Sequence, residues 1–536
     1  MRCGSDAFLW LYTMAMPNVT RLPVANPASP RRARWCVLLL SFLAACTTGP
    51  VDYPRTFSYI DTNTDDTRFG RAAAEWQKAH PSMSAFYPLI GGMDALGARL
   101  ALIDGAERTI DAQYFLMKND AAGLIFIMKL LEAADRGARV RFLLDDVFTS
   151  VDDEVFLLLD QHPNIEMRLF NPLGRGGNRW LNYVGDFDRA NRRMHNKSFT
   201  VDNKLSIVGG RNIAEEYFDL KPGGDFRDAD ILIAGFLVED IGRNFDRFWN
   251  HELAVPVEAF EPAQPGRELE TARAEAADEF GEAIGTIYGQ AIGSELVQDL
   301  LTDRVTLFAA EGEMISDEPD KLLKDVSADH QLLVTRMAEV VAGAESEVIV
   351  VTPYFIPGPD GVEFWRRLTE RGVRVIVLTN SLASTNHVAV HGAYARYRHR
   401  LIEAGVELYE LRVDAFTGDR DDDRPPIESV TLHTKAMLMD RRYTFIGSLN
   451  LDPRSIDINT EMGVLVDSAD MTKTLAVPFM EVIPERAYRV VENENGNLRW
   501  KAVIDGQEIV ETSEPQSGRW RRFKAFVSRI LPESQL

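Results

Sequence analysis

Two histidines, each followed at the same spacing by a lysine and an aspartate, stand far apart in the chain. The two sets, in "HNKSFTVD" and "HTKAMLMD", are His195, Lys197, Asp202 and His433, Lys435, Asp440. Alternate residues of a strand point to the same side, so we expect each histidine to share a face with its lysine. Two imidazoles and two ammonium groups together suit substitution at the phosphorus of a phosphodiester.

In such a reaction one neutral histidine attacks phosphorus and forms a covalent phosphohistidine. The other histidine, in its protonated form, donates a proton to the leaving alkoxide and later accepts one from the incoming alcohol. Histidine suits both tasks because its ordinary pKa is about 6.5. The lysines stabilise the charge that develops on the nonbridging oxygens. This chemistry requires no metal, the sequence has no evident ligand cluster for one, and we expect no cofactor.

Small residues and an asparagine follow each motif, after an apolar run that predicts a β-hairpin. The two stretches read "LSIVGGRN" and "YTFIGSLN". Small residues permit close backbone approach, and an asparagine amide supplies N–H donors to an anion. We therefore expect four residues of these stretches to contact or support the phosphate: Gly210, Asn212, Ser448 and Asn450.

The elements that must position these residues are duplicated. "GAERTIDAQYF" returns as "GAESEVIVVTPYF" and "RGARVRFLLDD" as "RGVRVIVLTNS", in the same order and at nearly the same displacement as the two motifs. The chain therefore contains two copies of one unit. Each copy predicts strand, helix and strand, at 109–117, 123–136 and 140–144, then at 347–355, 361–371 and 373–379. Such short links indicate a right-handed crossover and parallel strands in a covered α/β sheet.

The composition divides the remainder of the chain. We expect the first copy at 81–253, an acidic linker with a helical insertion at 254–335, the second copy at 336–483 and a C-terminal part at 484–536. Within the second copy, residues 414–429 are charged and contain prolines, which predicts a mobile surface loop. A length of 536 residues and a net charge of -22 fit two folded domains and argue against general nucleic-acid binding.

The C-terminal part predicts hairpins followed by an amphipathic helix. Asn495-Gly496 and Asp505-Gly506 are strong hairpin turns. The helix gathers apolar residues on one face, namely Trp520, Phe523, Val527, Ile530 and Leu531. Basic residues fill its other positions, namely Arg519, Arg521, Arg522, Lys524 and Arg529. Such a helix either lies on an anionic bilayer or packs on its own domain, and both alternatives stay open.

The N-terminus reads as an export signal. "SPRRARWCVLLLSFLAACTTGP" has basic residues, an apolar run too short for the roughly 20 residues of a membrane span, and small residues before Cys46. "LAAC" resembles a bacterial lipobox, which implies a signal peptide over 1–45, lipidation of Cys46 and a tether over 46–80. We expect a lipoprotein that faces the periplasm, with Thr47 favouring the outer membrane. The other cysteines, Cys3 and Cys36, lie within the signal, so the body has no disulfide framework.

The paired motifs resemble the phospholipase D superfamily. That resemblance implies two pseudo-symmetric α/β/α sandwich domains with one shared active site at their interface. It implies that His195 attacks, that His433 is the acid and base, and that both motif aspartates are structural. It also implies an acidic residue after each copy that orients an imidazole: Glu461 in the second copy, and Asp228 in the first, with Asp230 as a competitor. Gly210 stands where many members have serine, so the first side is expected to lack the hydroxyl donor of Ser448.

More narrowly, "RRMHNKSFTVDNKLSIVGGRNIAEEYF", "NSLASTNHVAVHGAYARYR" and "RFKAFVSRILPESQL" resemble the C-type branch of bacterial cardiolipin synthases. The branch implies transfer of a phosphatidyl group to phosphatidylglycerol, with phosphatidylethanolamine as a second candidate donor and the membrane as partner. The oligomeric state is not predicted. The alternatives are a hydrolase that releases phosphatidic acid, a periplasmic nuclease, and an inactive scaffold, which two complete motifs argue against. His387 and His391 in "HVAVH" lie four residues apart on an expected helix, where they could bind zinc, line a lipid cleft or only pack against it.

Overall fold

The structure is a computed structural model that describes residues 53–533, except 175–186, 222, 261–265, 267, 303, 324–330 and 418–426. Contacts divide the chain into residues 1–47 and 48–536, and all of the described residues lie in the second unit. The predicted signal peptide and Cys46 lie outside the described residues, as does most of the charged loop predicted at 414–429.

The first copy builds one half of a large mixed sheet. Its spatial strand order is β9-β4-β3-β2-β5-β6-β8-β1. The strands are β1 (Ser84–Leu89), β2 (Thr109–Tyr114), β3 (Arg139–Asp145), β4 (Ile165–Phe170), β5 (Ser198–Val201), β6 (Leu205–Gly209), β8 (Asp230–Gly235) and β9 (Ala254–Pro256). β2, β3 and β4 run parallel, as the predicted crossovers require, and β5–β6 is the hairpin that follows the first motif.

Read from the opposite end, so that β10 corresponds to β1, the second copy repeats this order as β10-β17-β16-β15-β11-β12-β13-β18. Strands β19 and β20 are added at its edge. The strands are β10 (Phe308–Ser316), β11 (Glu347–Val351), β12 (Arg374–Asn380), β13 (Glu407–Leu411), β15 (Ala436–Met439), β16 (Tyr443–Gly447), β17 (Met462–Asp467), β18 (Ala487–Glu492), β19 (Leu498–Ile504) and β20 (Gln507–Glu511). The equivalence of the two orders confirms the predicted duplication.

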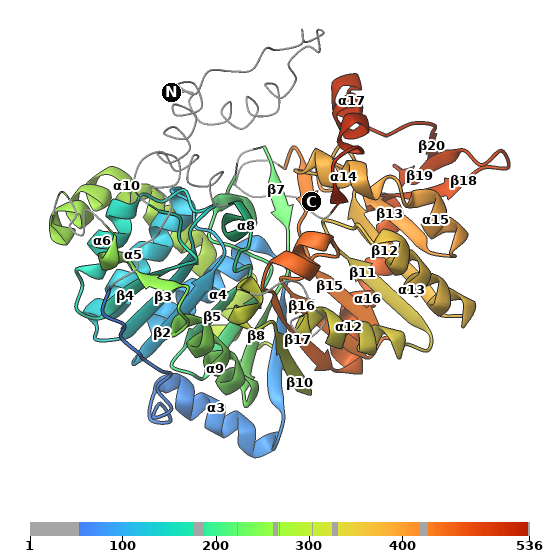
Figure 1. Cartoon of the computed structure of the whole chain (residues 1–536). Helices are drawn as coiled ribbons and strands as arrows, with labels where there is room; N and C mark the ends of the chain where they lie inside the picture. Colours follow the sequence, from blue (N-terminus) through green and yellow to red (C-terminus); the bar gives the residue numbers. More distant parts are fainter. Residues whose placement is uncertain are drawn as a thin grey trace, which may run out of the picture. The chain divides into compact units, whose positions relative to one another are not determined.

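Strands β1 and β10 pair antiparallel at Ser84–Phe86 and Phe308–Ala310, so the two copies share one 18-stranded sheet. Figure 1 shows the blue-to-green first copy and the yellow-to-red second copy meeting at this junction. Residues 254–335 therefore differ from the predicted linker. They contain the expected helical segment, α10 (Leu269–Ile292) and α11 (Glu295–Leu301), but they also contain β9 and β10, which are strands of the sheet.

Helices cover both faces of the sheet. In β3, Phe142 and Leu144 belong to the core beneath α5, whereas the intervening Leu143 packs with Phe245 of α9 on the opposite face. This alternation confirms the α/β/α sandwich, because a strand buried on both faces is apolar at successive positions. The first-copy helices are α3 (Arg68–Ala79), α4 (Gly92–Gly105), α5 (Ala121–Asp135), α6 (Asp153–Asp160), α8 (Phe187–Ala190) and α9 (Leu237–Trp249).

The second copy is covered by an equivalent set of helices. Val348 of β11 and Val375 of β12 share a core with Trp365 and Leu368 of α13, while Ile376 packs in a separate core on the other face. The helices are α12 (Leu332–Ala342), α13 (Gly358–Glu370), α14 (Val388–Tyr394), α15 (Arg398–Glu403), α16 (Ala469–Arg486) and α17 (Arg519–Ser528).

The segment expected to be a tether at 46–80 is held against the first copy where the structure describes it. Arg168 donates to the Thr56 carbonyl at 2.8 Å, and the Trp249 indole donates to Ser58 Oγ at 2.9 Å. The Ile60 amide donates to Asp246 at 2.9 Å, and α3 follows. Residues 56–79 are therefore part of the first folded copy, and a tether would have to end before them.

Strands β18, β19 and β20 form a meander that extends the second copy, since β18 pairs with β13. Its two turns fall at the Asn-Gly and Asp-Gly pairs. Gly496 (φ +73°), Asp505 (+51°) and Gly506 (+74°) take the left-handed conformation that such turns require. Helix α17 follows and packs on α14, where a Cβ at Gly392 would lie 2.5 Å from the Ala525 carbonyl oxygen.

Candidate active site

A short two-stranded ribbon connects the copies beside the second motif. β7 (Asp225–Arg227) pairs in parallel with β14 (Val430–Leu432), and the His433 amide donates to the Arg227 carbonyl at 2.7 Å. The first motif has the mirrored arrangement: Met194 bridges Thr460, and the His195 amide donates to the Thr460 carbonyl at 2.9 Å. Each motif histidine therefore lies beside the acidic segment of the opposite copy.

The two imidazoles are held by crossed carboxylates. His195 Nδ1 lies 2.8 Å from Glu461 Oε2, and His433 Nδ1 lies 2.6 Å from Asp228 Oδ2. Asp230, the competitor for the first-copy acid, instead accepts a hydrogen bond from Arg99 at 2.9 Å and contacts neither imidazole. Because each Nδ1 is engaged by an acid, Nε2 is the ring nitrogen that can meet a substrate atom, although Lys435 Nζ also lies 3.4 Å from Nε2 of His433.

Both lysines are buried beside their own histidines. Lys197 Nζ donates to the His195 carbonyl at 2.5 Å, and Lys435 Nζ lies 2.7 Å from His433 Nδ1 and 3.8 Å from Asp228. Burial lowers the pKa of Lys197 to about 7 and that of Lys435 to about 8, although the nearby carboxylates offset part of the effect. A buried ammonium group whose charge is only partly compensated by nearby carboxylates is well suited to binding an anion.

The histidines are neutral while no anion is bound. Burial, followed by the charge of Lys197, lowers the pKa of His195 well below its ordinary value. Burial and Lys435 lower the pKa of His433 to about 3, although Asp228 acts in the opposite direction. In the tautomer whose Nδ1–H donates to the carboxylate, the lone pair of the neutral ring is on Nε2.

The pKa values of the two carboxyls shift in opposite directions. Burial raises the pKa of Glu461 to about 7. Burial also opposes ionisation of Asp228, but Lys435 and His433 outweigh it and hold the pKa of that carboxyl below its usual range. Asp228, on the side of His433, is therefore the more firmly ionised of the two.

The Ser448 hydroxyl is committed to Glu461, to which it donates, while it accepts from the Met462 amide at 3.0 Å. It does not serve as the free phosphate donor that we expected. In the first copy, a Cβ at Gly210 would lie 2.2 Å from Asp228 Oδ1. The first side therefore lacks the serine hydroxyl, and the shorter acid occupies the space that a serine side chain would take.

Both asparagines brace neighbouring loops. Asn212 donates to the Tyr217 hydroxyl at 2.9 Å and accepts from the Leu116 amide at 3.3 Å. Asn450 donates to Ser455 Oγ at 3.3 Å, and its carbonyl oxygen has no hydrogen-bond partner among the described residues. Each side-chain amide has one further N–H that can be donated to an anion.

The motif aspartates anchor the hairpins. Asp202 accepts from the Arg108 amide at 2.7 Å and the Thr109 amide at 2.9 Å, at the start of β2. Asp440 accepts from the Ser346 amide at 2.7 Å and the Glu347 amide at 3.1 Å, at the start of β11. Both lie at the turn end of their hairpins, away from the paired acids that hold the imidazoles.

Aromatic rings, which the sequence analysis did not single out, flank both imidazoles. Phe115 meets His195 edge-on at 4.7 Å between ring centroids, and Phe148, 43% exposed, contacts Phe115 at 5.2 Å. Phe226 stacks on His433 at 5.1 Å, with Tyr217 edge-on at 5.2 Å. The position of Phe226, two residues before Asp228, is the only sequence signal for these contacts.

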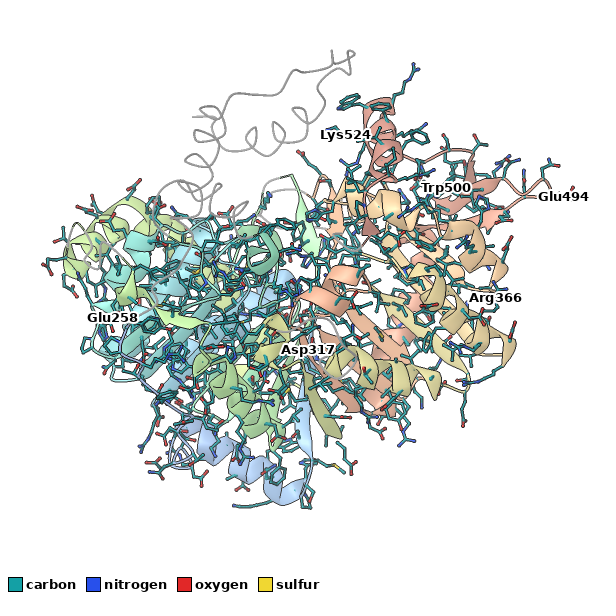
Figure 2. The ribbon with its side chains drawn as sticks, viewed as in Figure 1. Glu258, Asp317, Arg366, Glu494, Trp500 and Lys524 are labelled. Carbon is teal, nitrogen blue, oxygen red and sulfur yellow. The ribbon has the colours of Figure 1, made fainter. Side chains whose placement is uncertain are left out.

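Two further residues fix the backbone just before each histidine. Asp145 at the end of β3 accepts from the Met194 amide at 3.0 Å, and Asn380 at the end of β12 accepts from the Leu432 amide at 2.9 Å. Their equivalence was visible in the repeated "LLDD" and "LTNS", which served only to align the copies. Asp317 similarly supports the acid: it accepts from the Glu461 amide at 3.1 Å, at the junction of the copies (Figure 2).

The zinc alternative finds no support in the "HVAVH" histidines. His391 Nε2 lies 2.9 Å from Arg398 Nη2, so a guanidinium occupies the position of a metal. Throughout the described part of the chain, no three His, Cys, Asp or Glu side chains gather as metal ligands. None of the described helices combines the length and apolar character needed to cross a bilayer.

Comparison with known proteins identifies relatives of this chain. The family model described as "Cardiolipin synthase, PLD-like domain" matches residues 100–249 and 337–483, one match for each copy. Cardiolipin synthase C of Escherichia coli (strain K12) is 34% identical over 455 residues, which is 84% of this chain and 96% of the relative. An uncharacterized protein of Helicobacter pylori (strain 26695) is 31% identical over 90% of this chain and 95% of its own.

Among solved structures, phosphatidylserine synthase of Haemophilus influenzae is similar with a TM-score of 0.51. The sequences are 13% identical, and the match covers 78% of this chain and 92% of that one, so the likeness concerns the fold. The family model and the 34% identical relative agree with the paired motifs. This chain therefore belongs to the cardiolipin synthase family of phospholipase D-like phosphatidyltransferases.

Proposed function

We propose that this protein makes cardiolipin by transferring the phosphatidyl group of one phosphatidylglycerol to the glycerol hydroxyl of another. The observation that carries the proposal is the crossed pairing of His195 with Glu461 and of His433 with Asp228, which ties both imidazoles to one site. The relatives named cardiolipin synthase support phospholipids as the substrates.

In the first step His195 Nε2 attacks phosphorus, and the bond to the headgroup glycerol breaks. His433 gives its proton to the departing glycerol oxygen. A bound phosphodiester adds negative charge beside both lysines, so it raises the pKa of His433 above the low value of the empty site. The lysines hold the nonbridging oxygens as charge develops there.

The charge states of the acids support this division of roles. Asp228 is ionised and lies 2.6 Å from His433 Nδ1, so it stabilises the imidazolium that an acid catalyst must form. Glu461 has a pKa raised to about 7, and it therefore stabilises a charged His195 less. A neutral His195 with a free Nε2 lone pair is the better nucleophile.

In the second step the primary hydroxyl of another phosphatidylglycerol loses its proton to His433 and attacks phosphorus. The phosphorus–nitrogen bond to His195 breaks, cardiolipin leaves, and both histidines return to their starting states. Two phosphatidylglycerols thus give one cardiolipin and one glycerol. Water in place of the lipid alcohol would give phosphatidic acid, which is the hydrolase alternative.

Helix α17 is the element proposed to lie on the membrane. Its small residues Ala525 and Ser528 are buried against α14, so it packs on its own copy, as one of the two interpretations expected. Its other face leaves apolar side chains exposed, namely Trp520 (62%), Phe523 (52%), Phe526 (63%), Val527 (44%) and Ile530 (83%). Arg519, Lys524 (Figure 2) and Arg529 flank them, and residues 515–532 contain no acid. Exposed aromatic and basic residues together favour an anionic bilayer.

The N-terminal anchor belongs to the same proposal. Lipidation of Cys46 would tether the protein to a membrane facing the periplasm, with Thr47 favouring the outer one. Globomycin, which inhibits lipoprotein signal peptidase, should then cause an unprocessed precursor to accumulate. Unchanged processing would refute the assignment of a lipobox, but it would not contradict the proposed reaction.

The reaction is tested with purified protein and phosphatidylglycerol vesicles, with and without phosphatidylethanolamine as a second donor. Mass spectrometry should detect cardiolipin together with released glycerol, and a His195→Ala protein should form neither. Phosphatidic acid alone would establish the hydrolase, and DNA cleavage without lipid turnover would establish the nuclease.

A further inference from the structure

The loop 381–387, between β12 and α14, is bonded to β14, the strand that directly precedes His433. Thr431 of β14 donates to the Ser384 carbonyl at 2.7 Å, and Ser384 Oγ lies 3.0 Å from Asn380 Oδ1. Asn380 also donates to the Leu432 carbonyl at 2.8 Å. The base of the loop is therefore fixed to the residues that immediately precede His433.

The same loop is attached to the exposed helix α17. Arg521 donates to the Leu382 carbonyl at 2.5 Å and to the Thr385 carbonyl. One packed unit thus links the acid–base histidine to the helix proposed to lie on the bilayer. The residues at the tip of the loop consequently have a fixed position between the two.

That tip exposes two polar side chains, Asn386 and His387. Asn386 Oδ1 accepts from the Tyr354 hydroxyl at 2.9 Å, and the His387 ring meets Tyr354 edge-on at 5.3 Å. Within the described residues, neither the Asn386 NH₂ group nor the His387 ring has another hydrogen-bond partner. Crowding by the surrounding protein, followed by the charge of Arg454, lowers the pKa of His387, so its ring is neutral and can accept a hydrogen bond.

The tip is connected to two segments of the active site. Phe355, the neighbour of Tyr354, bridges Leu451, which directly follows Asn450. The base of the loop is bonded to Thr431 and, through Asn380, to Leu432, just before His433. The group is therefore placed to meet a substrate that occupies the site.

The residue of the first copy that corresponds to Tyr354 is apolar. The bridges Met117–Ile213 and Phe355–Leu451 are equivalent, so Leu116 corresponds to Tyr354. Beside His195 lies Phe115, which contacts the exposed Phe148. The hydroxyl that positions Asn386 therefore has no counterpart at the corresponding position of the first copy.

We propose that Asn386 and His387 bind the hydroxyl groups of the acceptor lipid headgroup. This inference rests on the proposed function and deepens it. A glycerol headgroup has two adjacent hydroxyls: one can accept from the Asn386 NH₂ group while the other donates to the neutral His387 ring. Binding there would keep the acceptor at headgroup depth, next to the base that takes its proton, and would favour it over water.

The test measures how the phospho-enzyme divides between two acceptors. Phosphatidylglycerol labelled in its headgroup glycerol releases label in the first step, whereas cardiolipin and phosphatidic acid report whether lipid or water completes the second. We expect His387→Ala and Asn386→Ala to keep label release but to lower the cardiolipin to phosphatidic acid ratio about five- to tenfold, the effect of one lost hydrogen bond. His387→Gln, which keeps an acceptor, should restore part of the ratio.

The matched control is His399→Ala, another exposed histidine, whose Nδ1 lies 2.7 Å from Glu492. It should leave the ratio unchanged. An unchanged ratio in both test variants would overturn the proposal, and so would loss of label release, because the residues would then act in the first step. If the unmodified protein releases no label, the proposed function itself fails.

Discussion

Replacing Asp228 with asparagine tests the pairing of His433 with Asp228 separately from the pairing of His195 with Glu461. The asparagine can keep a hydrogen bond to His433 Nδ1, but it removes the charge that stabilises the imidazolium and the carboxylate that lies 3.8 Å from Lys435 Nζ. A hydrogen bond to a charged group contributes about 1.5–3 kcal/mol, which corresponds to roughly 10- to 150-fold in rate. We therefore expect cardiolipin formation to fall by that factor, through a weaker acid at His433.

The assay compares a natural donor with a phosphatidyl ester that has a good leaving group, which needs no proton from His433. Asp228→Asn should then form the trapped phospho-enzyme nearly as well as the unmodified protein, as His433→Ala should, whereas His195→Ala should form none. Circular dichroism controls for folding, because a buried lysine has lost its partner. If Asp228→Asn instead behaves like His195→Ala, this carboxylate does not serve His433, and the crossed assignment is refuted.

Three other outcomes follow from the same geometry. The two motif lysines have pKa values of about 7 and about 8, so they are charged at low pH and lose their charge as the pH rises through these values. We therefore expect kcat/KM to decline across pH 7–8. A flat profile up to pH 10 would contradict the role of the lysines. Gly210→Ser should displace the Asp228 carboxylate and reduce lipid turnover at least tenfold, and adding Asp228→Glu should recover activity by copying the serine–glutamate pair of the second copy. Phe526→Glu should weaken co-flotation with anionic vesicles without lowering the melting temperature. The control Val510→Glu, at an exposed position on β20, should leave vesicle binding unchanged. Equal effects of the two changes would argue against α17 as the membrane element.

The repeated motifs were sufficient to predict the duplicated fold, because each landmark carries its own local signal. Apolar runs predicted β2, β3, β11 and β12 to within a few residues, and the Asn-Gly and Asp-Gly pairs predicted the turns of the C-terminal meander. These features depend on residues close together in the sequence. Local propensity and hydrophobic pattern are sufficient for such elements.

What the sequence could not provide depends on contacts between the copies. β10, "FAAEGEMIS", has a weak strand pattern, and it pairs with β1 over 308–310 and with β17 over 311–316. The choice between Asp228 and Asp230 was open because both are buried acids in one stretch. Only the β7–β14 ribbon shows that Asp228 reaches the histidine of the other copy.

The compensation between Gly210 and Asp228 was hidden for a different reason. Sequence comparison of the copies shows a missing serine, but it does not show that a side chain one methylene shorter changes where the carboxylate lies. The distance of 2.2 Å from a Cβ at Gly210 to Asp228 Oδ1 makes the two changes a single structural difference. This coupling depends on where the Asp228 side chain lies in space, which the sequence does not show.

The central claim is that one phosphate is shared by both imidazoles. Quenching the reaction with a labelled donor and locating the label by mass spectrometry tests it most directly. We predict at most one phosphatidyl group per chain, attached to His195, in the unmodified protein and in His433→Ala with a good leaving group. Two labelled histidines per chain, or label on His433 alone, would contradict a shared site with the roles described.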